Sequence, residues 1–207
     1  MINTRPMAAA ALLAASWAAQ AGVITGVTAS TDLGSNFGST IGSIVNGVGL
    51  TSYSLAASHN APTGGNAAGW VGRSTVGTID FNLHGSYALT TLAIWNFNGS
   101  VSSYGIQGLT ISSSTDGLAY TALAGAPTTF ARGANNTSEL AEIFSLGAAT
   151  TASFVRFNVG SNYGGAAAAM SEVMFDTTPV AAVPEPISLA LAGLALTGLG
   201  LTRRRQD

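Results

Sequence analysis

Two histidines, His59 and His84, are the only side chains in this sequence whose ordinary pKa lies near neutral pH. Acid–base or serine-type catalysis at neutral pH would therefore depend on one of them. His59 follows Ser58 in a polar stretch, and His84 precedes Gly85 at the end of an alternating segment. Neither residue lies in a nucleophile elbow or another local catalytic signature. We therefore expect a protein that is not an enzyme, and an extracellular hydrolase that uses one of these histidines is the catalytic alternative.

The composition excludes several other kinds of chemistry. Charged residues make up only 8% of the 207 residues, and all seven basic residues are arginines. A chain with so few cations has no basic surface for phosphates, so we expect no nucleic-acid partner. Because cysteine is absent, disulfides, thiolate zinc clusters and a cysteine nucleophile are excluded. The 47% of hydrophobic residues are enough for one domain with its own core, without a cofactor.

The first 21 residues have the pattern of a secretory signal peptide. Arg5 precedes an apolar run from Met7 to Trp17, and Ala19 and Ala21 stand just before Gly22. Small residues at these two positions fit a signal peptidase, and the run is too short to span a bilayer comfortably. We expect cleavage between Ala21 and Gly22, and a buried N-terminal helix is the alternative.

The C-terminus combines three features in a fixed order. Val183, Pro184, Glu185 and Pro186 precede an apolar stretch from Ile187 to Leu201, and three arginines, Arg203, Arg204 and Arg205, follow. An apolar helix of this length can cross a thin membrane, and the arginines would hold its end on the cytoplasmic side. From these residues alone, the segment is predicted to be a short membrane anchor.

This order of motifs closely resembles the PEP-CTERM sorting segment of Gram-negative bacteria. The resemblance implies recognition by an exosortase, transient insertion of the helix in the inner membrane, and cleavage near Pro184–Pro186. The protein would then be released or attached at the cell surface, whereas a retained helix would be a permanent anchor. Loss of both ends would leave three arginines and seven carboxylates, a net charge of about −4. Such a charge disfavours an anionic polymer held by charge alone.

The residues between these ends predict an all-β domain over 22–178, followed by the sorting segment over 179–207. Apolar and polar residues alternate in 79–84, 109–112 and 155–159, which is typical of strands with one buried face. Further strands are expected at 23–28, 92–97, 120–123, 143–146 and 170–175, separated by turn residues. The stretch from Thr51 to Gly69 is small and polar, so it is expected to be a long loop. Eight or so short strands favour a β-sandwich or jelly roll.

Several motifs in this body together resemble the discoidin, or coagulation factor 5/8 type C, group of galactose-binding-like folds. They include Ile44–Gly47, Trp70, Trp95–Asn98, Ser114–Gly117, Phe154–Phe157, Asn162–Gly165 and Ser171–Phe175. The resemblance implies a galactose-binding-like jelly-roll sandwich, flanked here by a signal helix and a C-terminal hydrophobic helix. Taken singly, the Asp116-Gly117 pair predicts a turn, and Trp70 and Trp95 are more typical of a core than of a ligand platform.

The family resembled often holds a structural calcium between an early loop and a late glutamate. In this sequence the matching positions are the loop that begins at Asn46 and the acid Glu172. The aspartate that usually adds charge in the early loop is absent, whereas calcium favours six to eight oxygen ligands. Weak or absent calcium binding is therefore expected, and no other cofactor. An ion pair between Glu172 and Arg156 on neighbouring strands is the alternative.

The same resemblance implies a sugar or surface ligand bound by loops at one end of the sandwich. Aromatic rings, amides and arginine are the groups suited to such ligands. The candidates in or beside predicted loops are Asn96, Asn98, Tyr104, Asn162, Tyr163, His59 and Arg73. For each of these residues, a role in closing a turn is the alternative.

Together these features predict an exported, non-catalytic carbohydrate-binding or adhesion module of the extracellular matrix or biofilm. Its expected partners are signal peptidase and an exosortase during export, and extracellular polysaccharide afterwards. The alternative is a structural matrix protein, either glycosylated or simply inert, without a specific soluble ligand.

Overall fold

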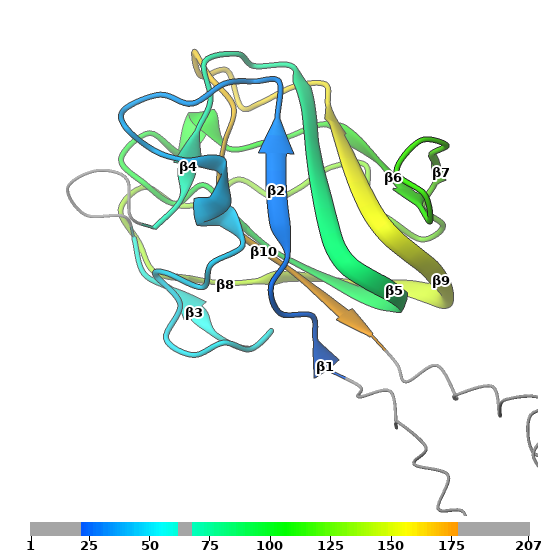
Figure 1. Cartoon of the computed structure of the whole chain (residues 1–207). Coiled ribbons are helices and arrows are strands. Elements are labelled where there is room, and N and C mark those ends of the chain that lie inside the picture. The colour runs from blue at the N-terminus through cyan, green and yellow to red at the C-terminus, as the bar shows by residue number, and fades with distance from the viewer. Residues whose placement is uncertain (1–21, 62–67, 178–207) are drawn as a thin grey trace, which may run out of the picture. The chain divides into compact units, whose positions relative to one another are not determined.

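The computed structural model describes residues 22–61 and 68–177, and the regular structure of this part is almost all strand (Figure 1). Its helical elements are two short 3-10 turns, η1 (Ile41–Ile44) and η2 (Ser102–Tyr104). No helix within 22–61 and 68–177 is long and apolar enough to cross a membrane. The predicted signal helix and C-terminal helix lie outside the described residues. The strands are β1 (Gly22–Val23), β2 (Thr28–Thr31), β3 (Ser58–His59), β4 (Trp70–Val71), β5 (Gly77–Asn96), β6 (Leu109–Ser114), β7 (Thr121–Ala122), β8 (Glu139–Leu140), β9 (Glu142–Val159) and β10 (Ala169–Thr177).

These strands form one antiparallel sheet of eight strands and a separate pair. The order in the large sheet is β1-β10-β5-β9-β6-β7, with β2 added beside β5 and β4 beside β10. The separate pair is β3 with β8. The all-β jelly-roll prediction is confirmed by this arrangement.

Two long, bent strands divide the large sheet into two facing layers. β5 has 20 residues and β9 has 18, and Figure 1 shows them curving side by side. Residues 79–82 of β5 pair with β2, whereas residues 89–96 pair with β10. Phe81 in the first part and Phe175 in β10 have ring centroids 5.2 Å apart. Because these rings come from different layers, the two layers pack face to face.

The core between the layers follows the alternation in the sequence. Ile79, Phe81 and Leu83 are fully buried, whereas the residues between them face outward. Phe81 also packs edge-to-face against Phe157 of β9, at 4.9 Å between ring centroids. Aromatic rings bury large apolar areas and favour this geometry, so Phe81 is a centre of the core.

Both tryptophans of the described residues are buried, as the sequence predicts for core positions. Trp70 donates its indole N–H to the carbonyl oxygen of Gly34 and the hydroxyl of Ser35, at 3.0 and 3.1 Å. Trp95 donates to the carbonyl oxygen of Ala57 at 3.1 Å. Each indole therefore links the sheet by a hydrogen bond to a segment that is distant in sequence.

The sequence predicted more strand breaks than the structure contains. The expected strands at 79–84 and 92–97 are parts of β5, and those at 143–146 and 155–159 are parts of β9. Gly85-Ser86 and Gly147 have turn composition, but at these points the ladder bends and continues. The register between β5 and β9 shifts between Asn82 and Tyr87, and His84 has a positive φ of 54°.

The segment expected as a long loop over 51–69 is described at 51–61 and 68–69, and Ala57 within it lies against the outer face of the second layer. Ala57 from this segment packs in a small cluster with Ala93, Trp95 and Met174. Ser58–His59 within it forms the two-residue strand β3, which the sequence did not predict. The outer face of the second layer is thereby covered by protein at this cluster.

The two ends of the described domain lie next to each other. Gly22 pairs with Thr177 and Val23 with Asp176, so β1 completes the edge beside β10. Since β10 also pairs with β5, it has a neighbouring strand on either side.

Candidate functional site

The outer face of the first layer presents two rows of neighbouring side chains. In one row, the strand pairing places Ser30, Asp80, Arg156 and Ser112 side by side on β2, β5, β9 and β6. In the other row, the same pairing places Thr28, Asn82, Phe154 and Ser114 side by side. Because successive side chains of a strand point to opposite faces, the alternation that buries Phe81 turns Asp80 and Asn82 outward.

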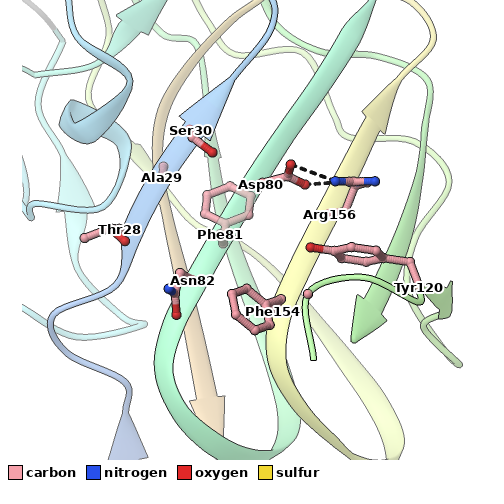
Figure 2. A pocket seen from close by; sticks show the side chains of 10 residues that line it. Thr28, Ala29, Ser30, Asp80, Phe81, Asn82, Tyr120, Phe154 and Arg156 are labelled. Atoms are coloured by element: carbon pink, nitrogen blue, oxygen red, sulfur yellow. Dashed lines mark hydrogen bonds and ion pairs between the residues drawn. The ribbon is translucent and has the colours of Figure 1, made fainter. Parts of the chain in front are cut away.

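Six side chains of these rows, those of Thr28, Ser30, Asp80, Asn82, Phe154 and Arg156, line a groove of about 340 Å³ (Figure 2). This volume lies within the roughly 300–1,000 Å³ that is typical of small-molecule sites. Thr28 and Ser30 border it on β2, and Gly117 and Tyr120 border it beside β9. Phe154 and Tyr120 are half-exposed and give the groove two aromatic rings.

A paired acid and base form the polar centre of the groove. Arg156 donates Nε–H to Oδ1 of Asp80 at 2.6 Å and Nη2–H to Oδ2 at 2.9 Å. Hydrogen bonding to Asp80 raises the pKa of Arg156 above its usual value. The guanidinium carbon of Arg156 lies 4.1 Å from the centroid of the Tyr120 ring. Bidentate pairing and stacking together hold Arg156 in one orientation.

Tyr120 is positioned by a well-defined turn after β6. Oδ1 of Asp116 accepts the hydroxyl of Ser114 at 2.8 Å and the N–H groups of Leu118 and Ala119 at 2.8 and 3.0 Å. The backbone N–H donors, Leu118 first, hold the pKa of Asp116 below its usual value. Gly117 has a φ of 76°, a conformation in which glycine is favoured, as the Asp-Gly pair predicts.

The turn also brings Gly117 close to the ring of Phe154. A Cβ atom on Gly117 would lie 3.2 Å from the ring of Phe154. The pKa of Tyr120 is raised, first by burial and then by the negative charge of Asp80. The phenol is therefore neutral and can both donate and accept a hydrogen bond at neutral pH.

Asn96 and Asn98, two of the predicted ligand residues, lie in the interior. Asn96 donates Nδ2–H to the carbonyl oxygens of Ile106 and Ala131, both at 2.7 Å. Asn98 donates to the carbonyl oxygens of His59 and Thr137, and it accepts the hydroxyl of Ser171 at 2.8 Å. These amides connect loops to the sheet, which corresponds to the turn-closing alternative.

The other predicted ligand residues do not line the groove either. Asn162 donates to the carbonyl oxygens of Gly165 and Ala167, and the hydroxyl of Tyr163 donates to the carbonyl oxygen of Phe130 at 2.5 Å. Tyr104 packs beside a small buried cluster that includes Phe97. Arg73 is exposed and donates Nε–H to the carbonyl oxygen of Ser35 at 2.6 Å. A ligand role for these four residues remains a prediction, separate from the groove.

His59 on β3 and Glu172 on β10 are two buried titratable side chains outside the groove. Both side chains are fully buried, and neither ring nitrogen of His59 has a well-formed hydrogen bond. Burial lowers the pKa of His59, an effect that nearby groups of Asn60, Val48 and Asn98 oppose. His59 therefore does not provide the surface ligand contact expected from the sequence.

Glu172 makes one hydrogen bond and leaves one oxygen without a partner. Its Oε2 accepts the N–H of Gly47 at 3.1 Å, whereas Oε1 is buried and unpaired. Burial raises the pKa of Glu172 to about 8, although the Gly47 N–H lowers it. At neutral pH the carboxyl group is therefore mainly protonated.

The residues at this position do not fit a calcium site. The early loop turns an N–H donor of Gly47, rather than an oxygen, toward the single carboxylate. The side-chain oxygen of Asn46 accepts the N–H of Val48 at 2.8 Å. Within 22–61 and 68–177, no group of three or more His, Cys, Asp or Glu side chains could hold a metal ion. A site with one carboxylate lacks the charge that calcium favours.

The alternative ion pair between Glu172 and Arg156 is wrong. Arg156 pairs with Asp80, and the two residues lie directly opposite each other on β9 and β5. β10 and β9 are not neighbours, because β5 lies between them in the sheet.

The groove was not identified from the sequence, although one signal for it is present there. Asp80, Asn82, Phe154 and Arg156 occupy the outward positions of two strongly alternating segments. An aromatic, an acidic and a basic side chain together at outward positions are typical of a binding surface. Tyr120 reaches the groove through the turn at Asp116-Gly117, and the sequence does not show where this turn lies relative to the sheet.

This fold is similar to several carbohydrate-binding modules of family 32 from Clostridium perfringens. The family 32 module of NanJ, solved in complex with galactose, has a TM-score of 0.52 and 16% identity, covering 75% of this chain and 98% of that one. Module CBM32-1 from a family 31 glycoside hydrolase has a TM-score of 0.54 and 13% identity, covering 75% and 97%. The fold class is thereby the galactose-binding-like jelly roll, as the discoidin resemblance predicts. Comparison with curated proteins gives no match.

The C-terminal segment provides the second part of the assignment. Residues 182–205 match the PEP-CTERM protein-sorting motif. This match contains Val183–Pro186 and Arg203–Arg205 and confirms the prediction of a sorting segment, although these residues lie outside the described structure. The chain therefore carries a signal for export to the cell surface, and the motif implies processing by an exosortase. The signal-peptide site at Ala19, Ala21 and Gly22 remains a prediction.

Proposed function

We propose that this protein is an exported, non-catalytic carbohydrate-binding module that holds polysaccharide in the groove on its first layer. Aromatic rings pack against the apolar faces of sugar rings, while polar side chains exchange hydrogen bonds with the hydroxyl groups. Tyr120 and Phe154 supply the rings, and Asp80, Asn82 and Arg156 supply the polar groups. The observation that carries the proposal is this combination in one groove, on a fold shared with carbohydrate-binding modules.

The same groove argues against hydrolysis of the bound sugar. Glycoside hydrolysis ordinarily uses two carboxyl groups about 5–9.5 Å apart, with one acting as an acid. Within 22–61 and 68–177, Asp80 is the one carboxylate that lines the groove, and both its oxygens are engaged by Arg156. Binding without catalysis is therefore the activity that this geometry supports.

The sorting motif supports a location for this binding activity. A module delivered to the cell surface would meet extracellular polysaccharide, and release by an exosortase of a Gram-negative cell would place it in the matrix or biofilm. The alternative, an inert structural matrix protein, would not require an open groove with two aromatic rings.

The test is titration of the full chain, kept soluble in mild detergent, with glycans that a glycan array selects. Tyr120→Ala and Phe154→Ala are each expected to weaken binding by about tenfold or more, because each removes a ring from the groove. Tyr53→Ala is the matched control, since Tyr53 is an exposed tyrosine outside the groove.

Three results would contradict the proposal in different ways. Loss of binding in Tyr163→Ala, with Tyr120→Ala unchanged, would move the site to the loops predicted from the sequence. Absence of any glycan binding would support the structural matrix protein. Glycan cleavage that disappears in a variant of His59 or His84 would support the extracellular hydrolase.

A further inference from the structure

Resting on the proposed function, we infer that the groove selects uncharged sugars and rejects uronic acids and other acidic sugars. This selection follows from how the charges of the groove are paired, and not from the fold or from the overall charge of the protein.

Among the described residues, Arg156 is the only cation that lines the groove, and its charge is already neutralised by Asp80. Arg156 uses Nε and Nη2 to bind both oxygens of Asp80, and the ring of Tyr120 covers it at 4.1 Å. An acidic sugar could form its own bidentate pair with Arg156 only by displacing Asp80. It would then lie beside a carboxylate that has lost its partner, and like charges at short range repel.

The other two arginines of the described residues are held elsewhere. Arg73 donates Nε–H to the carbonyl oxygen of Ser35, and Arg132 donates Nε–H to the hydroxyl of Ser102. Neither residue lines the groove. No free guanidinium of the described part is therefore placed to receive a carboxylate or sulfate there.

Two further carboxylates act on residues of the groove, although neither of them lines it. Asp116 lies in the turn that precedes Tyr120, and its negative charge acts on that phenol. The charge of Asp32 likewise acts on Arg156. An anion in the groove would be repelled by Asp80, which lines it, and also by the charges of Asp116 and Asp32 nearby, whereas it would be attracted by one guanidinium, so its approach is disfavoured.

Neutral hydroxyl groups suit the same arrangement. A sugar hydroxyl can donate to a lone pair of Asp80 and accept from a remaining N–H of Arg156 without separating them. Asn82 uses its side-chain oxygen to accept the N–H of His84 at 2.8 Å, which leaves its NH₂ group as a donor. The groove thus offers both donors and acceptors beside two aromatic rings, as neighbouring hydroxyls on a pyranose require.

The first experiment varies the ligand and leaves the protein unchanged. The full chain is titrated with oligosaccharides that differ only at C6: the neutral sugar, its uronic acid and the methyl ester of that acid. We expect the neutral oligomer to bind at least about tenfold more tightly than the acid. The methyl ester should recover most of the loss, because it has the bulk of the acid without the charge.

The second experiment varies the protein. Asp80→Asn frees Arg156 from its partner charge, so binding of the acid should increase at least about tenfold and should weaken as salt is added. Asp176→Asn is the matched control, because it removes the same charge from β10, outside the groove lining. Ser30→Trp, which fills the groove from β2, should abolish binding of both ligands.

The outcomes separate this inference from the proposed function. If the wild type binds the acid as tightly as the neutral sugar, the charge selection is wrong and the binding function stands. If Ser30→Trp leaves binding of the neutral sugar unchanged, the groove is not the site. If Asp80→Asn fails to fold, the comparison of acid with methyl ester on the wild type still decides the question.

Discussion

At the scale of single residues, the most unusual side chain is the carboxyl group of Glu172. It is fully buried, accepts one N–H from Gly47, and has a pKa raised to about 8 by burial. The folded protein therefore holds this proton more tightly than the unfolded chain does. The contribution to stability is complete below the unfolded pKa of 4.5 and is lost as the pH rises through about 8.

Glu172→Gln should remove this pH dependence, since the amide has the same shape and does not ionise. Between pH 6.5 and 9, the free energy of unfolding of the wild type should fall by about 2 kcal/mol more than that of the variant. Urea denaturation at a series of pH values measures the difference. The window begins at 6.5 because burial lowers the pKa of His59 below that value, and stability from His59 is lost only at lower pH.

Parallel pH profiles for the two proteins would show that Glu172 is ionised throughout. A calcium-dependent rise in the melting temperature of the wild type, absent in Glu172→Gln, would contradict our conclusion that the site does not fit calcium.

At the scale of elements, one pair of bent strands supplies both the core and the groove. Phe81→Ala should lower the free energy of unfolding by about 3–5 kcal/mol, because it leaves a cavity against Phe157 and Phe175. Phe154→Ala is the matched control on the outward face, and it should cost much less stability while weakening glycan binding. Chemical denaturation and glycan titration of both variants test this separation. Equal destabilisation by the two substitutions would show that Phe154 belongs to the core.

The sequence predicts the faces of these elements better than their extent. Alternation correctly assigns Ile79, Phe81 and Leu83 to the interior, since a period of two is a local property. The continuity of β5 through Gly85 could not be predicted, because it depends on pairing with β9, which is distant in sequence. The pair of Asp80 and Arg156 is 76 residues apart in sequence, so only the register of the sheet brings it together.

The buried amides show the same limit at the predicted ligand site. Asn96 and Asn98 lie near glycines and have the composition of exposed turns, yet their partners are backbone groups of other segments. Sequence reasoning identifies such polar groups, but it does not show whether protein or solvent satisfies them.

At the scale of the whole molecule, the described domain should fold without either terminal segment. A fragment of residues 22–177 contains both strands of the β1–β10 pairing and the complete core. We expect cooperative unfolding in urea and the same glycan affinity as the full chain. Aggregation of the fragment, or a lower affinity, would show that residues outside 22–177 contribute to the fold or to the groove.

The pairing of the two domain ends has a mechanical consequence. Any tether attached beyond Thr177 pulls directly on β10, which is hydrogen-bonded along its length to β5 and at its end to β1. Antiparallel hydrogen bonds run perpendicular to the strands, so a pull along β10 loads many of them in shear at once. Tension on such a tether would thus enter through a strand flanked on either side, while the groove residues lie on β2, β5 and β9 and on the turn before β7. The domain could therefore be held under flow from one end without the force passing first through the surface that we propose binds glycan.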